Sequence, residues 1–235
     1  MGETIFLAGA TGAIGRKLVP LLTEAGFTVY GSTRKPERAD SLRRAGVTPV
    51  VVDVFDGEAL KAALQQIKPS IVIHQLTDLP FGLDPAQMEE GRVRNARLRE
   101  VGTKNLVDAA VAVRAERMIS QSIAWAYQPG AGQITEEAPL QESATAIRTL
   151  EALTLTTSGI AGTVLRYGLL YGPGTGSDAP AGPISLHVDD AARGALLALG
   201  TFVIGVFNMV DDGGPISNAR AKSILAWQPA KRYGQ

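Results

Sequence analysis

The stretch Leu7-Ala8-Gly9-Ala10-Thr11-Gly12-Ala13-Ile14-Gly15 decides the fold. It follows a short apolar run and precedes a segment in which leucines recur at helical spacing, so the local order is strand, tight turn, helix. In such a turn Gly9 permits the bend, Gly12 lets a pyrophosphate approach the backbone, and Gly15 lets the helix pack closely on the sheet. The pattern predicts dinucleotide binding at the positive end of the first helix. The alternative is a glycine turn that only tightens a strand-helix corner.

Strands and helices alternate along the rest of the chain, which predicts right-handed crossovers and a parallel sheet. The expected fold class is therefore α/β, a doubly wound parallel sheet of the Rossmann type. Pro49 places the third strand at a sheet edge, because proline cannot donate to a ladder. We expect one domain over residues 1–235, of which roughly 168–235 form a small, incomplete substrate lobe. Strands are expected at 4–8, 27–32, 47–52, 70–74, 117–122, 163–167 and 205–210, helices at 16–25, 38–44, 59–66, 88–113, 150–158 and 188–199, and a loop at 172–183.

Composition excludes several classes of function. Basic and acidic residues number 23 each, so no net field attracts nucleic acid or an anionic membrane. The absence of cysteine excludes disulfides and thiolate chemistry, and two histidines argue against a metal site. The chain starts without a signal-like segment and no apolar run reaches spanning length, so we expect a cytoplasmic protein with a small-molecule substrate. A homodimer is left open.

The end of the second expected strand bears on the choice of cofactor. An acidic residue there would accept a hydrogen bond from the ribose 2′-hydroxyl of NAD, whereas an arginine accommodates the 2′-phosphate of NADP. The chain has Ser32-Thr33-Arg34-Lys35 at this point, with no acid. The guanidinium of Arg34 therefore favours NADP, with NAD as the alternative. The competing interpretation is a solvated basic turn.

The opening glycine stretch resembles that of the extended and atypical short-chain dehydrogenase/reductases, the epimerase/dehydratase-like proteins. The likeness continues in order through Val52-Asp53-Val54, Ile73-His74-Gln75-Leu76, Gly102-Thr103-Lys104-Asn105-Leu106, Leu165-Arg166-Tyr167-Gly168, Tyr171-Gly172-Pro173-Gly174, His187-Val188-Asp189-Asp190 and Gly205-Val206-Phe207-Asn208. Turn chemistry and resemblance together predict cofactor contacts from Gly9, Thr11, Gly12, Ala13, Ile14, Gly15, Thr33, Arg34, Asp53, Val54, Gln75, Leu76 and Tyr167.

The catalytic part departs from the family pattern. Family enzymes use a Tyr-x-x-x-Lys pair on one helix face. Aligning Glu151 with the acid that follows this motif puts Ser143 in place of the tyrosine and Ile147 in place of the lysine. Ser122 resembles the family's substrate-polarising hydroxyl, and Tyr127 lies near its usual aromatic position, so these two are the candidate catalytic residues. A backbone-satisfied hydroxyl is the alternative for Ser122.

Three functions follow from these observations. The first is an NADP-dependent oxidoreductase or epimerase-like enzyme acting on a small carbonyl or sugar-derived substrate, and the second is a non-catalytic dinucleotide-binding sensor or regulator. The third is a cofactor-independent isomerase or cyclase. His74 and His187 are expected to be core or capping residues. At 176–186 and 212–217 the chain is abrupt, because the family usually carries substrate-lobe segments at these places. This indicates either that loops are omitted from the given sequence or that the protein is a reduced member of the family.

Overall fold

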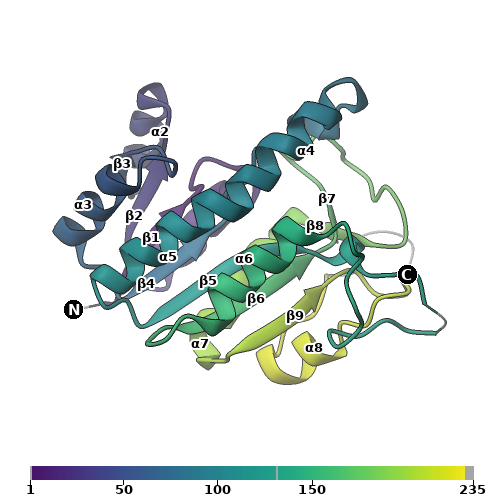
Figure 1. Cartoon of the computed structure of the whole chain (residues 1–235). Coiled ribbons are helices and arrows are strands. Elements are labelled where there is room, and N and C mark those ends of the chain that lie inside the picture. Colours follow the sequence, from purple (N-terminus) through teal and green to yellow (C-terminus); the bar gives the residue numbers. More distant parts are fainter. Residues whose placement is uncertain (1, 131, 231–235) are drawn as a thin grey trace.

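A computed structural model describes residues 2–130 and 132–230, and a seven-stranded parallel sheet forms its centre (Figure 1). The strand order is β3-β2-β1-β4-β5-β6-β9, and every neighbouring pair is parallel. The sheet grows outward in both directions from β1 and β4, which confirms the predicted doubly wound α/β fold. Its strands are β1 (Thr4–Ala8), β2 (Thr28–Thr33), β3 (Thr48–Val51), β4 (Ile71–His74), β5 (Arg117–Ile123), β6 (Ala161–Tyr167) and β9 (Gly205–Met209).

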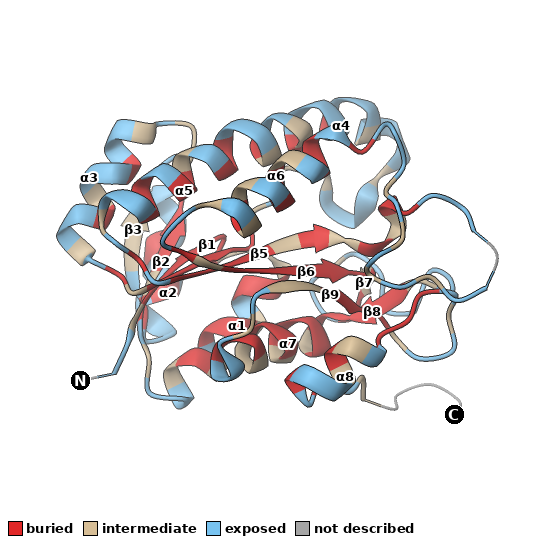
Figure 2. Cartoon of the chain, turned by 60° about the horizontal axis from the view of Figure 1, so that its bottom comes forward, coloured by how far each residue is buried: buried red, intermediate tan, exposed pale blue. Residues whose placement is uncertain are grey.

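Helices cover both faces of the sheet. In Figure 2 the helices α3, α4, α5 and α6 lie on one face, and α1, α7 and α8 lie on the other. Each helix turns its buried residues toward the sheet, as an amphipathic helix does. The bounds are α1 (Ala13–Glu24), α2 (Ala39–Arg44), α3 (Gly57–Ile67), α4 (Met88–Arg97), α5 (Thr103–Ala112), α6 (Thr145–Thr156), α7 (Val188–Thr201) and α8 (Ala219–Leu225).

The first strand supplies both halves of the core. Ile5 and Leu7 are fully buried against the layer of α1 and α7, whereas Phe6 packs with Leu60 and Leu64 of α3 on the opposite face. This alternation follows from the two-residue period of a strand. Burying each such side chain contributes about 1.5–3 kcal/mol, which holds the end of β1 in a fixed position beneath the glycine turn.

Several boundaries differ from the sequence-based expectation. The single helix expected at 88–113 is α4, a π-helical segment at Leu98–Gly102, and α5, and these form one continuous rod (Figure 1). The helix expected at 150–158 begins earlier, at Thr145, and ends at Thr156. The prediction that Pro49 lies in an edge strand is confirmed, because β3 is the terminal strand of the sheet.

The region after residue 168 contains elements that the sequence analysis missed. Two short strands, β7 (Leu169–Tyr171) and β8 (Ser185–His187), pair in parallel on either side of the expected loop, and α8 follows β9. Trp227 is fully buried, and its Nε1 donates a hydrogen bond of 2.9 Å to the backbone oxygen of Asp190 in α7. The substrate lobe from about residue 168 and the omission of loops at 176–186 and 212–217 stay predictions.

No helix of the described chain combines the length and apolar character that a bilayer span requires.

Candidate functional site

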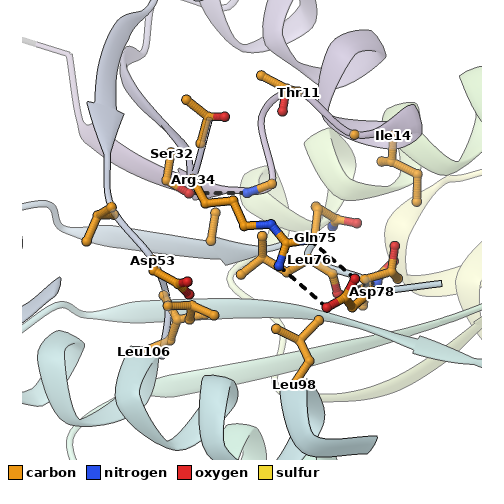
Figure 3. A pocket seen from close by; sticks show the side chains of 18 of the residues that line it. Thr11, Ile14, Ser32, Arg34, Asp53, Gln75, Leu76, Asp78, Leu98 and Leu106 are labelled. Atoms are coloured by element: carbon orange, nitrogen blue, oxygen red, sulfur yellow. Dashed lines mark hydrogen bonds and ion pairs between the residues drawn. The ribbon is translucent and has the colours of Figure 1, made fainter. Parts of the chain in front are cut away.

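A cleft of about 310 Å³ opens at the carboxyl ends of β1 to β4 (Figure 3). Parallel strands end at the same sheet edge, so the loops that follow them meet there, where ligands of such folds bind. Among the described residues that line the cleft, Gly15 and Tyr167 are absent, although both were predicted to contact the cofactor. The predicted contacts that do line it are Gly9, Thr11, Gly12, Ala13, Ile14, Thr33, Arg34, Asp53, Val54, Gln75 and Leu76.

The glycine turn closes one side of this cleft. Gly9 has a φ of +91°, and its amide donates to Ser32 Oγ at 3.4 Å, which ties the turn to the end of β2. Gly12 caps α1 without a side-chain hydrogen bond, so the first amides of the helix are left for a ligand. A Cβ at Gly12 would meet only the oxygen of Gly9, at 3.3 Å, whereas a Cβ at Gly15 would lie 2.2 Å from that oxygen. Gly12 therefore has more clearance than Gly15, and Gly15 serves the packing of the turn.

Gln75 carries an unsatisfied buried acceptor at the cleft wall. Its side chain is nearly fully buried, its Nε2 donates to the Tyr167 hydroxyl at 3.3 Å, and its Oε1 has no hydrogen-bond partner among the described residues. Burial raises the pKa of Tyr167, so its phenol stays protonated. A buried carbonyl oxygen without a hydrogen bond destabilises the fold by about 1–3 kcal/mol. A hydrogen-bond donor of a bound ligand would satisfy this oxygen. The cradle at Gly12 and this acceptor both fit a bound dinucleotide.

Basic side chains also line the cleft, after the end of β2. Arg34 and Lys35 line the cleft, and so does Arg38, whose Nη1 donates to Oγ1 of Thr11 in the glycine turn at 3.5 Å. Arg38 belongs to the helix expected at 38–44, and its position in the cleft was not predicted from the sequence. The available signal was Pro36, which opens a 3-10 turn at Pro36–Arg38 and brings the arginine back toward the glycine turn.

His74, at the end of β4, is fully buried and neutral. Its Nδ1 accepts the Leu76 amide at 3.2 Å, so its Nε2 donates to Thr103 Oγ1 at 3.0 Å. Burial, together with the charge of Arg99, lowers the pKa of His74 to about 4. The expectation of a satisfied core histidine agrees with this geometry.

Ser122 and Tyr127 belong to a buried polar network between β5, β6, α6 and β9. Ser122 Oγ donates to Glu151 Oε1 at 2.7 Å, and the Tyr127 hydroxyl donates to Asn208 Oδ1 at 2.7 Å. The same hydroxyl accepts from Arg166 Nη1 at 2.6 Å. Burial raises the pKa of Tyr127, although Arg166 opposes the shift. Neither residue lines the cleft in the described part of the chain, and their catalytic roles stay predictions.

The alternation of β5 explains this placement. Gln121 faces the cleft and donates from Nε2 to the backbone oxygen of Leu76 at 2.9 Å, whereas its neighbour Ser122 points to α6. The sequence of α6, TAIRTLEALTLT, contains neither tyrosine nor lysine. Ile147 is buried in an apolar cluster with Ala126 and Ala144, so its position supplies packing and no proton donor.

The family follows from comparison with known proteins. A family model described as NAD(P)H-binding matches residues 9–190, which include the glycine turn and most of the cleft lining. The chain belongs to this NAD(P)H-binding family. Its cofactor is accordingly a nicotinamide dinucleotide, and the resemblance to short-chain dehydrogenase/reductases is confirmed.

One relative of this NAD(P)H-binding protein is similar over most of its length. It is the 3-diazoavenalumate denitrifying reductase of a Streptomyces species. The two sequences are 38% identical over an alignment of 237 positions, which covers 88% of this chain and 76% of the relative.

Solved structures confirm the fold. UDP-glucose 4-epimerase from Thermotoga maritima has a TM-score of 0.77 at 19% identity, covering 97% of this chain and 94% of the epimerase chain. UDP-glucuronic acid 4-epimerase from Bacillus cereus, solved with UDP-glucuronic acid and NAD, has a TM-score of 0.80 at 17% identity, covering 98% and 95%.

Proposed function

We propose that this protein is an NADP-dependent reductase that delivers hydride to a small electrophile. The observation that carries the proposal is a single cleft lined both by the open helix amides at Gly12 and by the cations Arg34, Lys35 and Arg38. The helix amides suit a pyrophosphate, and the cations suit a 2′-phosphate. NADPH, when bound, supplies the hydride.

The likeness to the denitrifying reductase points to a class of substrate. Its name describes the reduction of a diazo compound with loss of nitrogen. In such a reaction the hydride forms a new C–H bond at the carbon that carried nitrogen, the C–N bond breaks, and its electron pair leaves with N₂. An aryl diazonium ion and NADPH then give the arene, N₂ and NADP⁺, and no proton has to be donated.

The composition of α6 supports this choice over reduction of a carbonyl. Carbonyl reduction needs a proton donor for the alkoxide, which family enzymes supply from the Tyr-x-x-x-Lys pair. Here α6 has neither residue, and the nearby hydroxyls of Ser122 and Tyr127 are engaged with Glu151 and Asn208. A substrate whose leaving group departs as neutral N₂ removes the need for that donor.

The test measures where the hydride of NADPH is transferred. Purified protein is incubated with 4-deuterated NADPH and either an aryl diazonium carboxylate or a panel of aldehydes and ketones. We expect deuterium at the former C–N carbon of the arene, with release of N₂, and little NADPH consumption with the carbonyls. The Gly12→Ala variant controls for reduction that does not need the cleft. Tight NADPH binding without turnover of either class would contradict the proposal and favour the non-catalytic alternative.

A further inference from the structure

The side chains of Arg34 and Asp78 meet across the proposed cofactor cleft. Figure 3 shows the guanidinium reaching from the end of β2 to the segment after β4, with Nη2 3.3 Å from Asp78 Oδ1 and Nη1 3.5 Å from Oδ2. Both residues line the cleft. The cation that suits a 2′-phosphate thus already faces a carboxylate.

Of the two partners, Asp78 is the one held in place. Its backbone amide donates to Oδ1 of the buried Asn95 at 2.9 Å, and its side chain is 18% exposed. Arg94 also approaches this carboxylate, with Nε 3.7 Å from Oδ1. The side chain of Arg34 is 53% exposed, so it is the partner that can swing away.

We propose that Asp78 tunes the cofactor selectivity of this cleft by holding Arg34 across it, so that a 2′-phosphate has to displace a carboxylate to reach the guanidinium. This inference rests on the proposed preference for NADP. When Arg34 moves to the phosphate, Arg94 remains beside Asp78 and balances its charge. Asp78 is therefore a positioning residue that acts through Arg34 and weakens NADPH binding more than NADH binding.

Calorimetric titration of the full chain tests the idea with four ligands: NADPH, NADH, 2′,5′-ADP and ADP. We expect Asp78→Asn to tighten binding of NADPH and 2′,5′-ADP about three- to fivefold, the range of a partly exposed ion pair, and to leave NADH and ADP within about twofold. The anchoring amide of Asp78 is kept in this variant, and its unfolding midpoint should match that of the unsubstituted protein.

Glu90→Gln is the matched control. Glu90 also pairs with Arg94, at 3.5 Å, but it is not part of the cleft lining, so its removal should change none of the four affinities. In an Arg34→Ala background, Asp78→Asn should no longer discriminate between the ligands, because the coupling passes through the guanidinium.

Two outcomes separate the two claims. If Arg34→Ala weakens NADPH selectively while Asp78→Asn leaves the NADPH to NADH ratio unchanged, the role of Asp78 is overturned and the cofactor preference stands. If Arg34→Ala weakens both nucleotides equally, the proposed preference for NADP fails, and the role of Asp78 fails with it.

Discussion

Arg166 binds the carboxylate of Glu151 at two points, with Nε 2.8 Å from Oε1 and Nη2 2.6 Å from Oε2. Both side chains are at most 7% exposed. Burial pulls the pKa of Arg166 down, but the hydrogen bonds and charge of Glu151 more than offset this, so the pKa is raised. The pair fixes α6 against β6.

Removing one charge of this pair should destabilise the fold. Glu151→Gln leaves the Arg166 guanidinium buried without its counter-charge, which costs about 3–5 kcal/mol of the free energy of unfolding. Urea denaturation measures the loss. The control is Asp40→Asn, which breaks the exposed pair with Arg43 and should cost less than about 1 kcal/mol.

Ser122→Ala separates a structural role from a catalytic one. The hydroxyl donates to Glu151, so its loss should lower the free energy of unfolding by about 1–3 kcal/mol and leave NADPH affinity unchanged. Denaturation and NADPH fluorescence check both points. A fall in kcat of about 100-fold or more with unchanged stability would instead assign Ser122 to the general acid-base machinery.

The two glycines of the turn should respond differently to alanine. Gly12 has a φ of −76°, and an added Cβ would require the Gly9 oxygen, 3.3 Å away, to shift only slightly, so Gly12→Ala should fold but obstruct the pyrophosphate and abolish measurable NADPH binding. Gly15→Ala would place a Cβ 2.2 Å from the Gly9 oxygen, so it should lower the thermal midpoint. If both variants lost binding only through unfolding, the cradle assignment would be wrong.

Arg34→Ala should weaken NADPH about 10- to 100-fold, the range of a charge-assisted hydrogen bond, and NADH much less. Arg44→Ala is the matched control, because Arg44 is the exposed last residue of α2 and is not part of the cleft lining. Titration with both nucleotides gives the ratio of affinities.

His74 should make stability depend on pH in the mildly acidic range. Its folded pKa of about 4 lies below the unfolded value of 6.5, so only the unfolded chain takes up a proton between these values. The contribution of His74 to the free energy of unfolding should therefore be constant above pH 6.5. It should fall by about 3 kcal/mol as the pH drops to 4. His74→Gln should flatten that slope in urea denaturation curves at pH 4 to 7.5. An unchanged slope would show that carboxylates alone produce it.

Local patterns in the sequence predicted the parts of the fold that depend on neighbouring residues. The glycine turn, the strand before it and the helix after it are encoded within residues 4–24, and the structure places them as expected. The strands β7 and β8 were missed because three-residue strands beside glycine and proline carry no periodicity of their own.

The surroundings of the candidate catalytic residues depend on contacts that are distant in sequence. Tyr127 meets Asn208 across 81 positions, and Ser122 meets Glu151 across 29. A motif shows which residue types are present, but the face of a strand decides whether a hydroxyl reaches the cleft. On β5 that face belongs to Gln121 and not to Ser122.

The burial of Trp227 limits how the protein can be engineered. Its indole fills the space beside Gly194 of α7, and the backbone amide of Ala230 donates to Asp190 Oδ2 at 3.1 Å. Cutting the polypeptide before this tryptophan would leave a void under the helix that follows β8. A carboxyl-terminal purification tag or fusion partner should therefore be attached after Ala230, so that the contacts of Trp227 and Ala230 with Asp190 are kept.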